Sequence, residues 1–120
     1  MTMTLNEYQL AAGKTNKGTR LYVRNEDGTY REVVGMYNAL AMNGEAGELA
    51  EKVKKDARDG EKDPLAARVQ KALELGDVLW YVSQEARDLG YTLDEIAEMN
   101  LKKLRDREAR GVLSGSGDNR

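Results

Sequence analysis

The chain contains no cysteine and no histidine. Without cysteine it has no disulfide, no thiolate metal site and no cysteine nucleophile. Without histidine it has no imidazole base, which excludes a Ser-His-Asp triad and a histidine-ligated zinc site. A metal ion held by this protein must therefore be bound largely through oxygen, and oxygen ligands favour a hard cation such as Mg²⁺ or Mn²⁺.

The chain also lacks an excess of positive charge and a long apolar run. Its 19 Lys and Arg residues nearly balance its 21 Asp and Glu residues, for a formal net charge of −2. It therefore has no basic excess of the kind that marks a nucleic-acid-binding surface. No stretch approaches the roughly 20 consecutive apolar residues of a membrane span, and the first ten residues do not have the pattern of a signal peptide. We expect a cytoplasmic protein that binds neither nucleic acid nor membrane.

A length of 120 residues fits one domain. The chain has a single proline, and its second half is rich in Ala, Leu, Glu and Lys, a composition typical of helices. We predict an all-α domain over residues 1–113. A flexible polar tail follows over residues 114–120, which is either a disordered end or a loop that closes over a ligand.

Four helices are predicted from apolar residues that recur every three or four positions and from capping signals. They span about residues 4–13, 34–59, 63–89 and 92–111. The first and the last begin at Thr4 and Thr92, each followed three positions later by Glu, which is the capping-box pattern. The third begins at Asp63, followed by a proline at the first helical position.

Residues 20–34 differ from the rest of the chain. Two short β-branched and aromatic runs flank the turn-rich sequence NEDG, in which Gly28 suits a backbone angle φ above zero. This pattern predicts a small β-hairpin or an extended excursion between the first two helices.

Two pairs of acidic residues do not fit a plain helical core. Glu45 and Glu48 are three positions apart, which places them within about 60° of each other on a helix. Glu74 and Asp77 are the only charged residues in the run 72–82. That run is apolar on nearly every face, so we expect its helix to be buried on most sides. An ionised carboxylate in such a place needs a cationic partner, hydrogen bonds or a metal ion.

If the second and third helices are antiparallel neighbours, the two acid pairs converge. Four carboxylates in one place repel one another unless cations neutralise them, and this agrees with the hard cation expected from the composition. Two simpler interpretations remain open. The first pair can lie on a solvated helix face, and the second can form salt bridges with Lys54 or Lys55.

Three further features have both a structural and a functional interpretation. Asn100 lies on the apolar stripe of the fourth helix, where its amide either bonds another helix or faces a ligand. The basic residues within 102–107 are either a solvated face near the helix end or contacts to phosphate. Trp80 and Tyr81 are either core aromatics or a stacking surface for a base.

The segments GEAGELAEKVKK, ELGDVLWYV and LDEIAEMNLKKLRDR resemble the MazG-like nucleoside triphosphate pyrophosphohydrolases, members of the all-α NTP pyrophosphatase superfamily. The resemblance covers roughly residues 4–15 and 36–113, while the segment 16–35 is longer and more β-like than the family pattern. Gly44 stands where many members have an additional Glu, so one possible ligand is absent. The implied fold is a four-helix core formed by dimerisation, in some members as a tetramer.

The resemblance implies hydrolysis of a nucleoside triphosphate to a monophosphate and pyrophosphate with Mg²⁺, or with Mn²⁺ in its place. By this resemblance Glu45, Glu48, Glu74 and Asp77 bind the metal ions. Glu48, with Glu45 as the second candidate, orients or deprotonates the attacking water. Candidates for contacts with the substrate are Lys52, Lys55, Trp80, Tyr81, Asn100, Lys103 and Arg107.

The substrate could be a common deoxynucleotide, a modified one, dUTP or dCTP, and with less support phosphoribosyl-ATP. The partners expected are this nucleotide and further copies of the chain, in a homodimer or homotetramer. The alternatives are a non-catalytic helical module that binds a nucleotide or a partner, and a plain helical scaffold.

Overall fold

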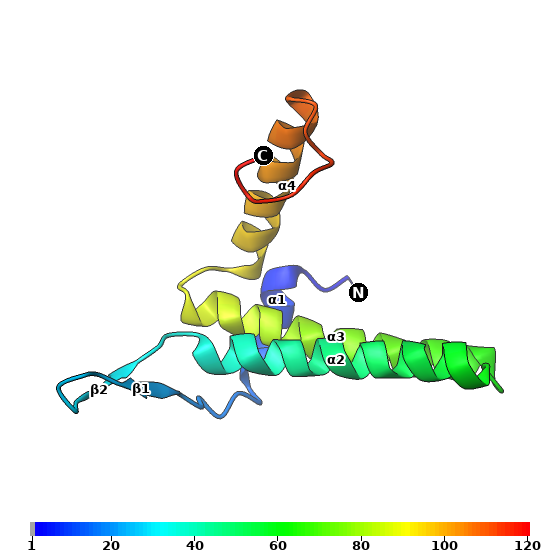
Figure 1. The fold of residues 1–120 in the computed structure, drawn as a ribbon, viewed down its shortest axis with the longest axis horizontal. Coiled ribbons are helices and arrows are strands. Elements are labelled where there is room, and N and C mark those ends of the chain that lie inside the picture. Colours follow the sequence, from blue (N-terminus) through cyan, green and yellow to red (C-terminus); the bar gives the residue numbers. More distant parts are fainter. Residues whose placement is uncertain (1) are drawn as a thin grey trace.

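The computed structural model describes residues 2–120 and contains four helices and one two-stranded hairpin. The elements are α1 (Leu5–Gly13), β1 (Tyr22–Arg24), β2 (Tyr30–Glu32), α2 (Met36–Asp59), α3 (Pro64–Asp88) and α4 (Leu93–Ala109). The long helices α2 and α3 run side by side and antiparallel, α1 packs against α3, and α4 projects away from the pair (Figure 1). The predicted fold class, an all-α chain with a small hairpin insertion, is confirmed.

The helix ends follow the capping signals of the sequence. Thr4 and Thr92 each form a complete capping box with the Glu three positions later, and the Asp63 side chain caps α3. Two boundaries differ by two residues. The end of α4 lies at Ala109 rather than near residue 111. The start of α2 lies at Met36 rather than near residue 34. Gly35 is the cause: its φ of 76° lies in the left-handed region, which a right-handed helix does not include.

The predicted hairpin is confirmed as β1 and β2. The strands pair antiparallel, with Tyr22 opposite Glu32 and Arg24 opposite Tyr30. Gly28 in the connecting turn has a φ of 87°, as expected. Within residues 2–120 neither strand packs on a helix, and the hairpin extends beyond the end of the α2–α3 pair (Figure 1).

The burial of α3 differs from the prediction. Leu73 and Leu75 are 65 % and 55 % exposed in the single chain, whereas Ser83 and Gln84 are completely buried. The expectation of a helix buried on most sides is therefore wrong for one copy of the chain, since α1 and α2 leave part of its apolar surface uncovered. None of the helices in the described part of the chain is long and apolar enough to cross a membrane.

Candidate metal and nucleotide site

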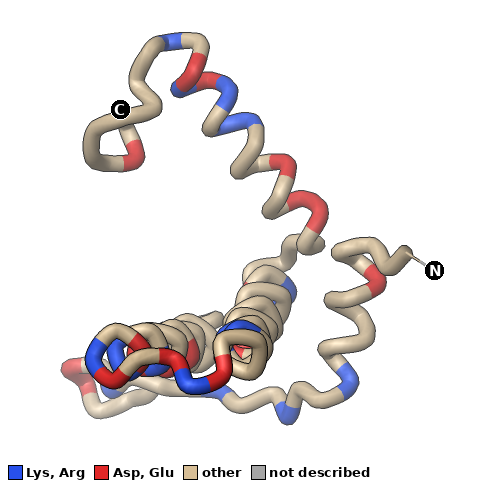
Figure 2. The backbone as a smooth tube through the Cα atoms, turned by 90° about the vertical axis from the view of Figure 1, so that its right-hand side faces the viewer, with Lys and Arg blue, Asp and Glu red and all other residues tan. Residues whose placement is uncertain are grey.

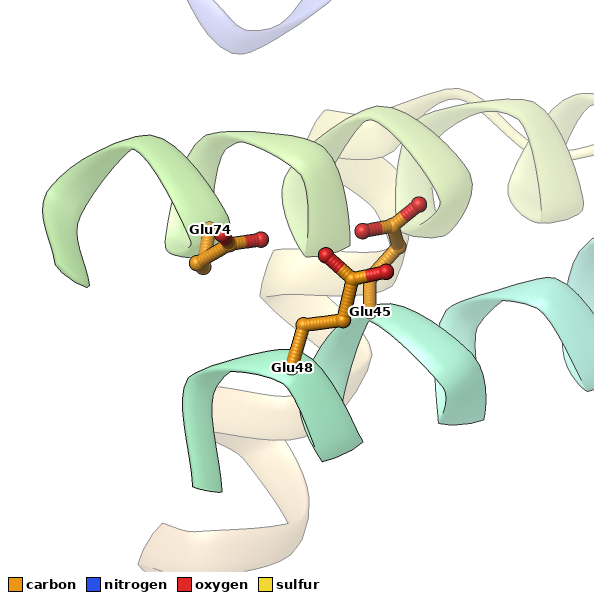
Figure 3. Close-up of side chains that lie close together, drawn as sticks. All are labelled: Glu45, Glu48 and Glu74. Atoms are coloured by element: carbon orange, nitrogen blue, oxygen red, sulfur yellow. The ribbon is translucent and has the colours of Figure 1, made fainter. Parts of the chain in front are cut away.

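Three carboxylates converge where α2 faces α3. Glu45 and Glu48 of α2 and Glu74 of α3 each offer one oxygen, and these oxygens all lie within 4.8 Å of one another (Figure 3). Glu45 and Glu48 are one helical turn apart, so both reach toward the neighbouring helix. We call Glu45, Glu48 and Glu74 the acid cluster.

Asp77, the fourth acid of the sequence pattern, lies beside the cluster rather than in it. It lines a cavity together with Glu45, and its negative charge contributes to the raised pKa of the Glu45 carboxyl. Desolvation is the largest cause of that raised pKa, followed by the charges of Glu48, Asp77 and Glu74. The structure therefore brings three of the four predicted carboxylates together and places Asp77 in the lining of the adjoining cavity.

Among residues 2–120, one lysine forms a salt bridge with the acid cluster. The Lys52 Nζ lies 3.1 Å from Glu74 Oε1, whereas Lys54 and Lys55 pair with Glu51 on their own helix. A salt bridge of the kind considered above is thus present, but with a different lysine. One positive charge faces three carboxylates, so the cluster keeps a net negative charge that a cation would relieve.

The donor set of the acid cluster suits a hard divalent cation. Its three side chains offer only oxygen, and they come from two helices that hold one another in place. Mg²⁺ and Mn²⁺ prefer carboxylate and water oxygens. Glu74 is only 9 % exposed, and a buried carboxylate among like charges is stabilised by such an ion.

A cavity of about 460 Å³ lies next to the acid cluster. Acidic, aromatic and loop residues line it: Glu45, Asp77, Tyr37, Trp80, Tyr81, Thr15, Asn16, Lys17 and Thr19. The Trp80 indole Nε1–H donates to Thr15 Oγ1 at 2.9 Å, and its ring meets that of Tyr81 edge to face at 4.8 Å between centroids. Carboxylates that hold a cation suit the phosphate end of a nucleotide, and aromatic faces in the same cavity suit its base.

The other candidate residues are spread over the chain. Lys55 lines a smaller cavity of about 240 Å³ together with Lys52. Asn100 and Lys103 are exposed on α4, whose basic residues gather in its second half (Figure 2). Arg107 is 4 % exposed and donates to the carbonyl of Asp118 in the tail at 3.2 Å. Within one chain, α4 does not bring these three residues to the acid cluster, because it packs on α1 and α3 only.

Sequence reasoning missed Tyr37, in the first turn of α2, and the cavity residues of the segment 15–19, which precedes that helix. Tyr37 and the segment 15–19 carry no catalytic motif, and their part in the cavity depends on how the segment folds back toward α3. The segment 15–19 could have been singled out because it departs from the helical pattern, and polar residues outside a helix often carry function.

The model of one protein family matches this chain. The family is described as the MazG nucleotide pyrophosphohydrolase domain, and it matches residues 37–112. This chain belongs to the MazG family. The matched range includes the acid cluster and Asp77, so the family assignment and the geometry concern the same residues.

A curated relative of this MazG domain is the "Gene 37 protein" of Mycobacterium phage L5. The two sequences are 47 % identical over 87 residues, which is 70 % of this chain and 75 % of the phage protein. No solved structure matches the chain.

Proposed function

We propose that this MazG protein is a Mg²⁺-dependent nucleotide pyrophosphohydrolase of the cytoplasm, which hydrolyses a nucleoside or deoxynucleoside triphosphate to the monophosphate and pyrophosphate. The observation that carries the proposal is the acid cluster beside an aromatic-lined cavity, in a chain of this family. Mn²⁺ has similar ligand preferences and is expected to replace Mg²⁺.

In the proposed site Glu45, Glu48, Glu74 and Asp77 hold the metal ions. When bound, these ions neutralise phosphate charge and make water more acidic. Glu48 is the proposed base that orients the attacking water and takes its proton. It is exposed and forms no salt bridge among the described residues, whereas Glu74 is paired with Lys52.

Glu45 is the second candidate for the base. The choice between Glu45 and Glu48 rests on access, because Glu48 is exposed and Glu45 is half-buried.

The cavity would hold the nucleoside end of the substrate. Trp80 and Tyr81 supply aromatic surface for the base, and the volume of about 460 Å³ lies within the usual range for small-molecule sites. Lys52 and Lys55 would contact the phosphates, since ammonium groups bind phosphate oxygens as point charges.

A second copy of the chain would complete the site. The exposed leucines of α3 offer an apolar surface for this copy, and the family resemblance implies a homodimer or homotetramer. Asn100 and Lys103 would then reach the substrate from the neighbouring subunit, and Arg107 would do so once its hydrogen bond to the tail carbonyl of Asp118 is broken. Light scattering that shows a stable monomer at micromolar concentration would refute this part of the proposal.

Pyrophosphate release from a panel of NTPs and dNTPs tests the reaction. The panel is run with Mg²⁺, Mn²⁺ or EDTA, for the native chain and for Glu48→Gln. We expect metal-dependent release of pyrophosphate and a monophosphate from the native chain, and its loss in the variant. Release of inorganic phosphate instead would show that a different bond is cleaved.

The competing functions give different results in the same experiment. A non-catalytic binding module binds nucleotide without releasing pyrophosphate. A plain helical scaffold neither binds nor hydrolyses nucleotides.

A further inference from the structure

A buried polar connection joins α1 and α3, and none of the roles proposed above uses it. Gln84 and Ser83 of α3 are the largest completely buried side chains in the described range. Burying a polar side chain is unfavourable unless its groups are hydrogen-bonded. Apolar residues would fill the same space without that requirement, so the bonds that Gln84 makes need an explanation.

The side-chain amide of Gln84 is fixed on both sides. Its Nε2 donates to Ser83 Oγ at 3.0 Å and to the backbone carbonyl of Gln9 at 3.4 Å. Its Oε1 accepts from the Asn16 amide Nδ2 at 2.9 Å. Turning the amide over would place donor against donor and acceptor against acceptor, so Gln84 holds one orientation and presents only an acceptor to Asn16.

Asn16 connects Gln84 to the backbone of the segment 15–19. Its Oδ1 accepts from the Gly18 backbone N–H at 2.8 Å, and Gly18 has a φ of 68°. Both ends of the Asn16 amide are therefore used: one end meets α3 and the other shapes the turn.

The segment 15–19 forms a wall shared by two cavities. Asn16 and Thr19 line the cavity beside the acid cluster, and they also line a second cavity of about 490 Å³. Tyr37 lines both as well. A shift of Asn16 would thus change the shape of the space beyond the acids, while the acid cluster itself is held by α2 and α3.

We propose that Gln84 is a positioning residue for nucleotide binding: through Asn16 it holds the segment 15–19 as the wall against which the nucleoside end of the substrate packs. This inference rests on the proposed function and deepens it. Gln84 does not touch the substrate. Its removal weakens binding of the nucleoside end. Binding of the phosphate end, by Lys52, Lys55 and the metal ions that the acid cluster would hold, stays unchanged.

Equilibrium binding in the presence of Mg²⁺ tests this inference by calorimetry. The probes are the four common deoxynucleoside monophosphates, which contain the nucleoside end, and inorganic pyrophosphate, which lacks it. The variants are Gln84→Met, Asn16→Ala and the double variant. Met has nearly the length of Gln and makes none of its hydrogen bonds. Asn16 is only partly buried, so Asn16→Ala tests the same connection from the side where folding is least at risk.

We expect Gln84→Met to weaken monophosphate binding about tenfold, as for the loss of one well-placed hydrogen bond, with pyrophosphate binding unchanged. Asn16→Ala should give a similar loss. The double variant should bind like Asn16→Ala alone, because Gln84 acts through Asn16. The matched control is Gln9→Met, the same exchange in a half-buried side chain that donates to the carbonyls of Ser83 and Tyr91 and is not bonded to Asn16. This control should lower the melting temperature and leave the binding of both probes unchanged.

Three results would overturn the inference: unchanged monophosphate binding in Gln84→Met, equal weakening of both probes, or additive losses in the double variant. The binding measurement does not require turnover. A native chain that binds monophosphates but releases no pyrophosphate from triphosphates therefore refutes the proposed catalysis alone. A native chain that releases pyrophosphate from triphosphates but binds none of the four monophosphates refutes this inference alone.

Discussion

Replacing Glu48 by Gln is expected to stabilise the metal-free protein and to remove its stabilisation by Mg²⁺. Glu48 repels Glu45 and Glu74 in the acid cluster and has no cationic partner in residues 2–120. Glu74 is a less decisive choice, because Lys52 lies 3.1 Å from it and offsets the repulsion from its two acidic neighbours. A neutral residue at position 48 removes only repulsion.

The expected magnitude follows from the separation of the charges. Two unit charges 4.8 Å apart interact with about 3.5 kcal/mol at an effective dielectric constant of 20. Glu48 is exposed, and solvent reduces interactions between exposed charges to at most about 1 kcal/mol. A gain of about 1 kcal/mol corresponds to a rise of roughly 3–6 °C in melting temperature for a domain of this size.

The assay is thermal unfolding in EDTA and in about 10 mM Mg²⁺. A site with a dissociation constant of about 1 mM would stabilise the native chain by about 1.4 kcal/mol under these conditions. The matched control is Glu51→Gln on the same helix. Hydrogen bonding to Lys54 lowers the pKa of Glu51, so its neutralisation should lower the melting temperature slightly and keep the Mg²⁺ effect.

Two results would refute this reasoning. A fall in the melting temperature of Glu48→Gln in EDTA would show that Glu48 makes a favourable contact in the folded chain. A full Mg²⁺ effect in the variant would show that the ion binds elsewhere.

Three further predictions concern the fold. Burial, and then the charge of Asp88, raise the pKa of Glu85. The contribution of Glu85 to stability is therefore present below the ordinary glutamate pKa and is lost as the pH rises through the pKa of the folded state. Calorimetry of Glu85→Gln should show a higher melting temperature than the native chain near pH 7.5 and no gain near pH 4. Gly35→Ala should lower the free energy of unfolding in urea by about 1–3 kcal/mol, because φ is 76° and a Cβ would clash with the Glu85 carboxylate. Gly44→Ala lies in open space within α2 and should raise the free energy of unfolding by up to about 1 kcal/mol. Thr92→Ala should cost about 1 kcal/mol in the same assay through loss of the α4 cap, and Thr92→Ser should restore it.

The helices and the convergence of the acids could be predicted from the sequence because both depend on short-range rules. A capping box involves residues three positions apart, and Thr4 and Thr92 both form one. The turn between Asp59 and Pro64 is short, so α2 and α3 must be neighbours. This places the two acid pairs on neighbouring helices, and each pair lies on one face of its own helix.

The partner of Glu74 could not be predicted in the same way. Lys52, Lys54 and Lys55 are all within reach along the chain, and which of them faces α3 depends on the rotation of one helix against the other. The burial of α3 was mispredicted for a related reason. An apolar surface shows that a helix needs a covering layer, but not whether the same chain provides that layer.

The hydrogen bonds of Gln84 also could not be predicted from local sequence patterns. Its bond to Asn16 joins residues 68 positions apart, and nothing in either neighbourhood predicts that pairing. The available signal was weak: two polar residues, Ser83 and Gln84, directly follow a run that is apolar on nearly all faces. Polar residues that interrupt such a run have to be hydrogen-bonded if the helix stays buried.

The hairpin has a consequence for how this chain can change during evolution. Since neither strand packs on a helix, opening or rebuilding Tyr22–Glu32 disturbs no contact that holds α2 against α3. Its three-residue strands add little to global stability and unfold as a local unit. Insertions, deletions and new side chains are therefore tolerated there at little thermodynamic cost, and the family match begins only at residue 37, just beyond the hairpin. New contacts can evolve on this segment while the carboxylates between the two long helices stay in place.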